Sequence, residues 1–141
     1  MNFAKWVLRG AGILGLFLIV PFYFTEAQVG RDLPPAITHP EYYYGFLGVA
    51  LAWQIAFLIM STDPLRYRPL LVAALVEKGS YAIAAFWLFA LGRIPTLILG
   101  TGVMDLMLGL LLVAAYVATA PSRTASAERA AWRAPLSTPQ S

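Results

Sequence analysis

Residues 69–119 read PLLVAALVEKGSYAIAAFWLFALGRIPTLILGTGVMDLMLGLLLVAAYVAT, two long apolar runs on either side of Gly92, Arg93 and Pro95. Each run is close to the ~20 residues with which a helix crosses the ~30 Å hydrocarbon layer of a bilayer. Lipid offers the backbone no hydrogen bonds, so spans of this kind must be helices, which satisfy their backbone groups internally. Because the connection is short, the two helices should lie antiparallel and side by side. The stretch therefore predicts a transmembrane helical hairpin.

The first half of the chain has the same pattern. Apolar runs at 3–24 and 42–61 join those at 69–91 and 95–119 as predicted spans. We therefore predict an all-α membrane protein, an up-down-up-down bundle of four transmembrane helices within residues 1–119. Residues 120–141 are rich in Pro, Ser, Thr and Ala and include three arginines, a composition typical of disorder. They predict a disordered tail on the cytoplasmic side.

The composition supports the membrane assignment. Of the 141 residues, 60% are hydrophobic and 12% charged, with a mean hydropathy of +0.70, whereas a soluble domain carries ~25% charged residues. A small protein buries too little surface to hide so much apolar area from water. The net charge of +3 lies in loops and ends rather than on one basic face, so nucleic acid is not an expected partner. With no cysteine and one histidine, we expect neither metal nor cofactor.

The distribution of Lys and Arg predicts one orientation in the membrane. Seven lie on one predicted side and two on the other, and cytoplasmic loops carry the excess. We therefore expect a multi-pass protein of the inner (plasma) membrane with both termini in the cytoplasm. The seven are Lys5, Arg9, Arg66, Arg68, Arg123, Arg129 and Arg133, and the two are Arg31 and Arg93.

An alternative for residues 1–27 is a cleaved secretory signal, because Lys5 and Arg9 precede an apolar run. The bulky side chains of Phe22, Tyr23 and Phe24 argue against it, since a cleavage region prefers small residues. Aromatic residues at this position are typical of the membrane interface.

Four polar side chains interrupt the apolar spans: Gln54, Glu77, Lys78 and Asp105. An ionisable group in a span costs ~2.5–3.5 kcal/mol on insertion scales, so it usually faces the bundle interior and has a partner. Counted from the connections, Gln54 and Glu77 should lie at the same depth. Lys78 and Asp105 should differ by about four residues, or ~6 Å, which a lysine stem can span. We therefore predict one polar layer near mid-membrane.

Two carboxylates share this layer with one lysine, so one carboxyl should hold a proton near neutral pH. Adjacent residues of a helix point about 100° apart, so Lys78 should pair with Asp105. Glu77 would then be the protonated acid, held by Gln54. Three interpretations remain open: a buried salt bridge that fixes helix register, a proton-coupled transport site, or a pocket for a lipid-soluble molecule.

A second group of polar residues lies at the predicted outer edge of span 42–61, where His39 and Glu41 precede Tyr42, Tyr43 and Tyr44. The pattern is typical of a helix start with an aromatic interface belt. The alternative is a mouth for a quinone, a lipid or a haem edge, formed by His39, Glu41 and Tyr43.

Several features together resemble the small bacterial four-helix membrane proteins called DoxX-like in the broad sense. They are Gly45 and Gly48 early in one span, the loop with Asp63-Pro64 and arginines, and Asp105 with Gly109. The resemblance implies a membrane partner of redox enzymes with a link to quinone. This chain lacks a motif that would carry that chemistry.

These observations predict a non-enzymatic membrane subunit or scaffold that contacts lipid and other membrane proteins or itself. The alternatives are a proton-coupled carrier, or a lipid- or quinone-binding protein that uses the Gln54, Glu77, Lys78 and Asp105 layer. A membrane-embedded enzyme with Glu77 or Asp105 as general acid or base also remains open.

Overall fold

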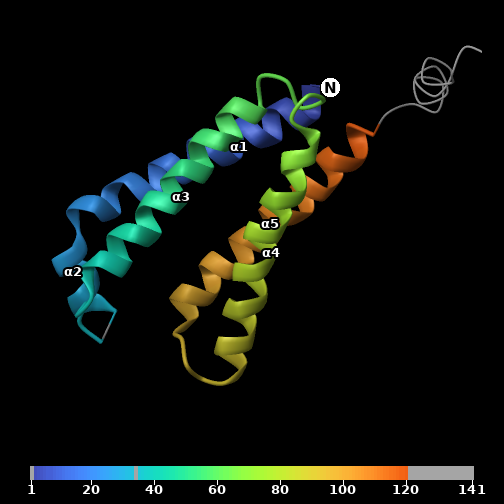
Figure 1. The fold of residues 1–141 in the computed structure, drawn as a ribbon. Coiled ribbons are helices and arrows are strands. Elements are labelled where there is room, and N and C mark those ends of the chain that lie inside the picture. Colours follow the sequence, from blue (N-terminus) through green and yellow to red (C-terminus); the bar gives the residue numbers. More distant parts are fainter. Residues whose placement is uncertain (1, 34, 121–141) are drawn as a thin grey trace, which may run out of the picture.

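The structure, a computed structural model, describes residues 2–33 and 35–120 (Figure 1). Four of its helices are long and apolar enough to span a membrane, so the predicted all-α, four-span fold is confirmed. The predicted disordered tail, 120–141, lies outside the described residues except for Ala120. The elements are α1 (Asn2–Ile19), the 3-10 helix η1 (Val20–Phe24), α2 (Glu26–Asp32), α3 (Pro40–Met60), α4 (Arg68–Ala90) and α5 (Thr96–Ala118).

Proline and glycine set most of the helix boundaries. Pro40 and Pro69 occupy first-turn positions of α3 and α4, and Pro95 directly precedes α5. Proline suits these positions because its fixed φ is helical and its missing N–H would have no partner there. Pro21 stands where α1 tightens into η1. Gly92 has a φ of +66° in the turn between α4 and α5, a conformation that glycine adopts without strain.

The short helix α2 was not predicted, because its segment was expected to be only a connection. Glu26 lies in its first turn and Arg31 in its last, which matches the charges of the helix dipole. The Tyr44 hydroxyl donates to Glu26 Oε2 over 2.9 Å, and the Tyr43 hydroxyl donates to the Phe22 carbonyl over 2.8 Å. These bonds fasten α2 and the end of α1 to the start of α3.

The four long helices form two hairpins. Helix α1 packs against α3, and α4 packs against α5. The hairpins touch mainly through α1 and α5, while α3 and α4 make little contact although they are consecutive. The predicted side-by-side pairing is confirmed for α4 and α5, whereas the consecutive helices α3 and α4 are not close neighbours over their length. Ala11 of α1 belongs to the same buried cluster as Leu71 and Ala74 of α4 and Leu112 of α5.

The hairpins meet at one end and part at the other (Figure 1). We call the meeting end, with the start of α1, the α3–α4 connection and the end of α5, the closed end. The opposite end, with α2 and the α4–α5 turn, is the open end. The core lies toward the closed end and consists of Leu8, Ala11, Phe57, Met60, Leu71, Ala74 and Leu112. The many exposed apolar side chains on the other faces are suited to contact with lipid.

At the closed end, Arg68 ties α4 to the last turn of α5. Its guanidinium carbon lies 3.7 Å from the centroid of the Tyr116 ring, and its Nε donates to the Tyr116 carbonyl over 3.4 Å. Such stacking is a favourable use of a planar cation. The contact helps to hold the second hairpin together beneath the core.

Candidate functional site

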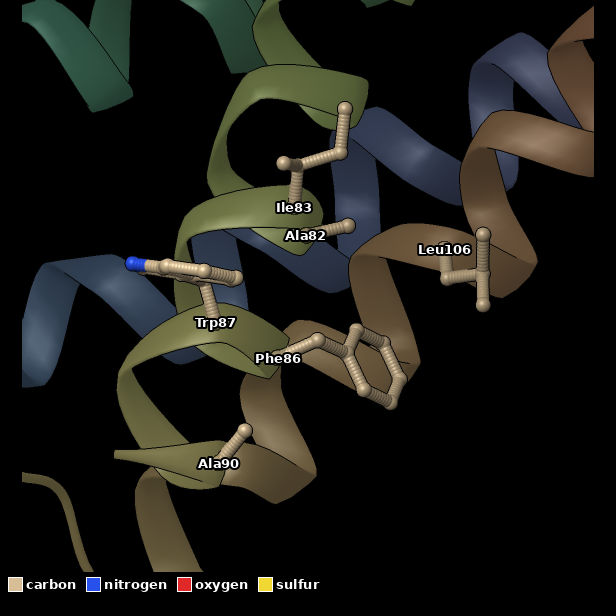
Figure 2. Close-up of a pocket in the computed structure, with 6 residues that line it drawn as sticks. All are labelled: Ala82, Ile83, Phe86, Trp87, Ala90 and Leu106. Carbon is tan, nitrogen blue, oxygen red and sulfur yellow. The ribbon is translucent and has the colours of Figure 1, made fainter. Parts of the chain in front are cut away.

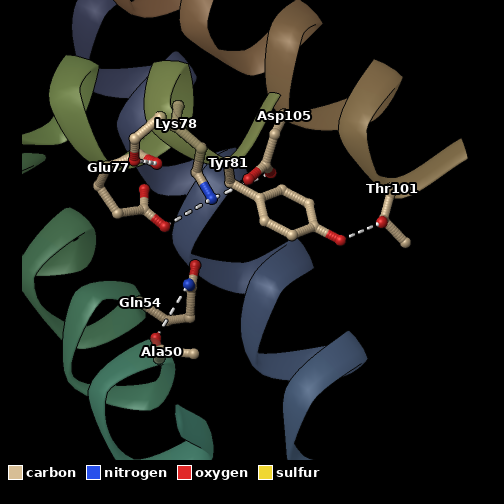
Figure 3. A network of polar contacts seen from close by, with 8 residues as sticks. Ala50, Gln54, Glu77, Lys78, Tyr81, Thr101 and Asp105 are labelled. Atoms are coloured by element: carbon tan, nitrogen blue, oxygen red, sulfur yellow. Dashed lines mark hydrogen bonds and ion pairs between the residues drawn. The ribbon is translucent and has the colours of Figure 1, made fainter. Parts of the chain in front are cut away.

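The structure brings the predicted mid-span polar residues together, from three helices (Figure 3). The Lys78 ammonium on α4 lies 3.1 Å from Asp105 Oδ1 on α5 and 3.2 Å from Glu77 Oε1 on α4. The side chains of Lys78 and Asp105 are 9% and 10% exposed, and that of Glu77 is 25% exposed. Gln54 of α3 is buried beside them. We call these four residues the polar cluster.

Small residues let α4 and α5 approach closely enough for the short Asp105 side chain to reach Lys78. A Cβ added to Gly102 would come 2.5 Å from the Ala85 Cβ, and one added to Gly109 would come 3.7 Å from the Lys78 Cβ. Small residues at helix contacts have this effect in membranes generally. Gly102 and Gly109, on either side of Asp105 along α5, therefore both face α4.

Lys78 also contacts the core. Its ammonium lies 5.9 Å from the centroid of the Phe57 ring, which is fully buried on α3. A cation within about 6 Å of an aromatic face is attracted to it. Lys78 therefore contacts side chains of α4, α5 and α3.

The expected pairing of Lys78 with Asp105 is confirmed, but two details of the prediction were wrong. Lys78 contacts Glu77 as well, because the long lysine stem can bring the ammonium back to the neighbouring side chain. Gln54 does not hold Glu77: its Nε2 donates to the Ala50 carbonyl one turn earlier on α3, over 3.0 Å. Polar side chains in helices often bond the backbone of their own helix in this way.

Gln54 is held in place by α1. A Cβ on Gly15 would overlap the Gln54 side-chain amide. The absence of a side chain at Gly15 of α1 thus leaves room for a polar side chain of α3. At Gly12, an added Cβ would come 2.9 Å from the Gln54 backbone carbonyl oxygen.

The Glu77 carboxylate has one oxygen without a partner. Its Oε2 atom is buried and forms no hydrogen bond. Every other buried side-chain nitrogen or oxygen of the described residues has a hydrogen-bond partner. Fully ionised, Glu77, Lys78 and Asp105 would carry a net charge of −1. The chemistry available to this arrangement is ion pairing and the binding of a proton.

A hydrogen bond beside the polar cluster was not predicted from the sequence. The Tyr81 hydroxyl lies 2.7 Å from Thr101 Oγ1, and Thr101 in turn donates to the Ile98 carbonyl. Tyr81 is therefore the donor to Thr101, which joins α4 to α5 on the open-end side of Asp105 (Figure 3).

The predicted outer-edge group is only partly brought together. His39 Nδ1 lies 3.0 Å from Glu41 Oε1, and both side chains are exposed. Tyr43 points elsewhere and bonds the Phe22 carbonyl, so it anchors the start of α3 rather than completing a site. In the part of the chain that the structure describes, no three His, Cys, Asp or Glu side chains are grouped as metal ligands would be.

A shallow apolar groove of about 380 Å³ lies on the outer surface of the second hairpin (Figure 2). Five of its lining residues come from α4 and one from α5, and all are apolar or aromatic. They are Ala82, Ile83, Phe86, Trp87, Ala90 and Leu106. The groove lies toward the open end and offers a surface for an acyl or similar apolar chain.

Comparison with models of known protein families, with curated proteins and with solved structures finds no match to this chain. Its function is therefore inferred from the side chains and from the way the helices hold them.

Proposed function

We propose that the protein is a non-enzymatic subunit or scaffold of a membrane assembly. The observation that carries the proposal is the parting of the two hairpins. A self-sufficient four-helix bundle packs each helix along its length, whereas here α3 and α4 hardly meet and the core is gathered at the closed end. The open end therefore leaves helix faces free for another membrane helix, supplied by a partner protein or a second copy of this chain.

The face of α4 that carries Glu77 suits such a contact. Ala73, Ser80 and Ala84 lie on the same face of α4 as Glu77, and all three are exposed. Association within lipid depends on close packing between backbones, which small residues permit. Because lipid tails are as apolar as most helix faces, this small-residue face is a better indicator of a partner than exposed leucines would be.

We further propose that the protein lies in the inner (plasma) membrane of a bacterium, with both termini in the cytoplasm. The closed end gathers Lys5, Arg9, Arg66 and Arg68, while the open end carries Arg31 and Arg93. The positive-inside rule then favours a cytoplasmic closed end. On the basis of the DoxX-like resemblance, we also propose that the partner in this assembly is a redox enzyme linked to quinone.

Photo-crosslinking in the native membrane tests the proposed role. A photoreactive residue at Ser80 or Ala84 should form an adduct with a second protein chain, which mass spectrometry identifies. The matched control is Leu110, an exposed apolar position on α5 outside this face, which should give lipid adducts only. Lipid adducts alone at all three positions would contradict the proposal.

A lipid- or quinone-binding role is the second candidate. It is favoured by the apolar groove that residues of α4 and Leu106 of α5 line on the second hairpin. A photoreactive quinone analogue should then label Phe86 or Trp87 in reconstituted protein. Labelling spread evenly over the exposed faces of α4 and α5 would contradict this candidate.

A further inference from the structure

We infer that Glu77 is a proton-binding site: it holds one proton at neutral pH, beside the ion pair of Lys78 and Asp105. The inference is independent of the proposed subunit role, since it concerns the charge state of the chain itself.

The charges that face Glu77 do not balance without a proton. Helix α4 contributes Lys78 and the neutral Tyr81, α5 contributes Asp105, and α3 contributes the neutral Gln54. Helix α1 contributes no charge at this depth, because its Lys5 and Arg9 lie in its first turns at the closed end. One ammonium thus faces two carboxylates. An uncompensated charge in a span is costly, and one bound proton removes it.

The contacts assign that proton to Glu77 rather than to Asp105. Lys78 donates to Oε1 of Glu77, while Oε2 is buried and receives no hydrogen bond. A proton bound to Oε2 leaves Oε1 as the acceptor of the Lys78 bond, so protonation breaks no contact in the polar cluster. It also turns the unpartnered oxygen from a buried anionic acceptor into a neutral hydroxyl, whose desolvation costs far less.

Glu77 lies nearer the surface of the helix pair than the other charged members of the polar cluster. Its side chain is 25% exposed, against 9% for Lys78 and 10% for Asp105, and it lies on α4 next to exposed Ala73 and Ser80. A position bordered by lipid favours the neutral form of a carboxyl group, whereas Asp105 lies inside the α4–α5 contact beside Lys78.

Infrared spectroscopy of the full chain in lipid nanodiscs tests the inference. The wild type should show a protonated-carboxyl band at neutral pH. Glu77→Gln should lose that band, whereas Glu41→Gln, which alters an exposed carboxylate at the open end, should keep it. Because glutamine has nearly the shape of a protonated glutamate, Glu77→Gln should fold.

Isotope labelling assigns the band without a mutation. Glutamate labelled with ¹³C at its carboxyl group should shift the band, and labelled aspartate should leave it unchanged. No protonated-carboxyl band at neutral pH would overturn the inference. A band that persists in Glu77→Gln, or that shifts with labelled aspartate, would assign the proton to Asp105 and overturn it equally.

Discussion

Lys78 is the residue on which the polar cluster depends, and its replacement gives the sharpest stability prediction. Lys78→Ala removes the ammonium that lies 3.1 Å from Asp105 and 3.2 Å from Glu77. Removing one member of a buried ion pair costs about 3–5 kcal/mol, because the remaining charge is left uncompensated. A loss of about 4 kcal/mol corresponds to roughly a thousand-fold change in the folding equilibrium.

Two further variants separate the charge of Lys78 from its packing. Lys78→Met keeps a stem of similar length without the charge, and Lys78→Arg keeps the charge. We expect the wild type to have the highest free energy of unfolding, followed by the Lys78→Arg, Lys78→Met and Lys78→Ala variants in that order. Combining Lys78→Met with Asp105→Leu should recover part of the loss, because replacing both members of a buried pair by apolar residues is often neutral.

Reversible unfolding in mixed micelles measures these differences. Arg93→Ala serves as the control, since Arg93 is an exposed cation in the α4–α5 turn, and it should change the free energy of unfolding by less than about 0.5 kcal/mol. A Lys78→Ala variant as stable as the wild type would refute the reasoning, because the ammonium paired with the buried Asp105 carboxylate cannot be removed in lipid without cost.

Three other predictions concern packing and orientation. Gly12→Ala should destabilise the protein by about 1–3 kcal/mol, because the added methyl meets a backbone carbonyl of α3; Gly10→Ala has open space and should be neutral or slightly stabilising in the same unfolding assay. Arg68→Lys should cost about 0.5–1 kcal/mol by losing the stacking on Tyr116, and a Tyr116→Leu background should reduce that difference. Fused after Ser141, a reporter that works only in the cytoplasm should be active, and a reporter that works only in the periplasm should be inactive. The opposite result would contradict the proposed orientation.

The spans could be predicted from sequence almost to the residue because hydropathy and proline act locally. Pro40, Pro69 and Pro95 lie within one residue of the observed helix starts. The helix α2 could not be separated from a loop in the same way, since its seven residues are too few to show a periodic pattern.

The pairing of the helices could not be predicted from hydropathy. In lipid, the packed and the lipid-facing sides of a helix are both apolar, as buried Leu47 and exposed Phe46 show on α3. Small residues were the more informative signal, because Gly12 and Gly102 do mark close contacts. The glycines did not show which helix each of them contacts, because that depends on how all four helices pack. In the structure, α1 rather than α3 makes the main contact with the second hairpin.

The members of the polar cluster could be named from sequence, because charged residues in a span are few and require partners. Their bonds could not be, since these depend on side-chain conformation. Gln54 turned back to Ala50, and Lys78 reached both acids instead of one. The depth estimate still held well enough to place Lys78 within reach of Asp105.

The central claim is that the two hairpins join at the closed end and part at the open end, with the polar cluster between. The chain has no cysteine, so pairs of cysteines can be introduced and spin-labelled without background. Pulsed electron paramagnetic resonance in nanodiscs should give a shorter distance between labels at Phe3 and Val117, at the closed end, than between labels at Phe24 and Leu97, at the open end; all four positions are exposed. Equal distances, or a longer one at the closed end, would contradict the account.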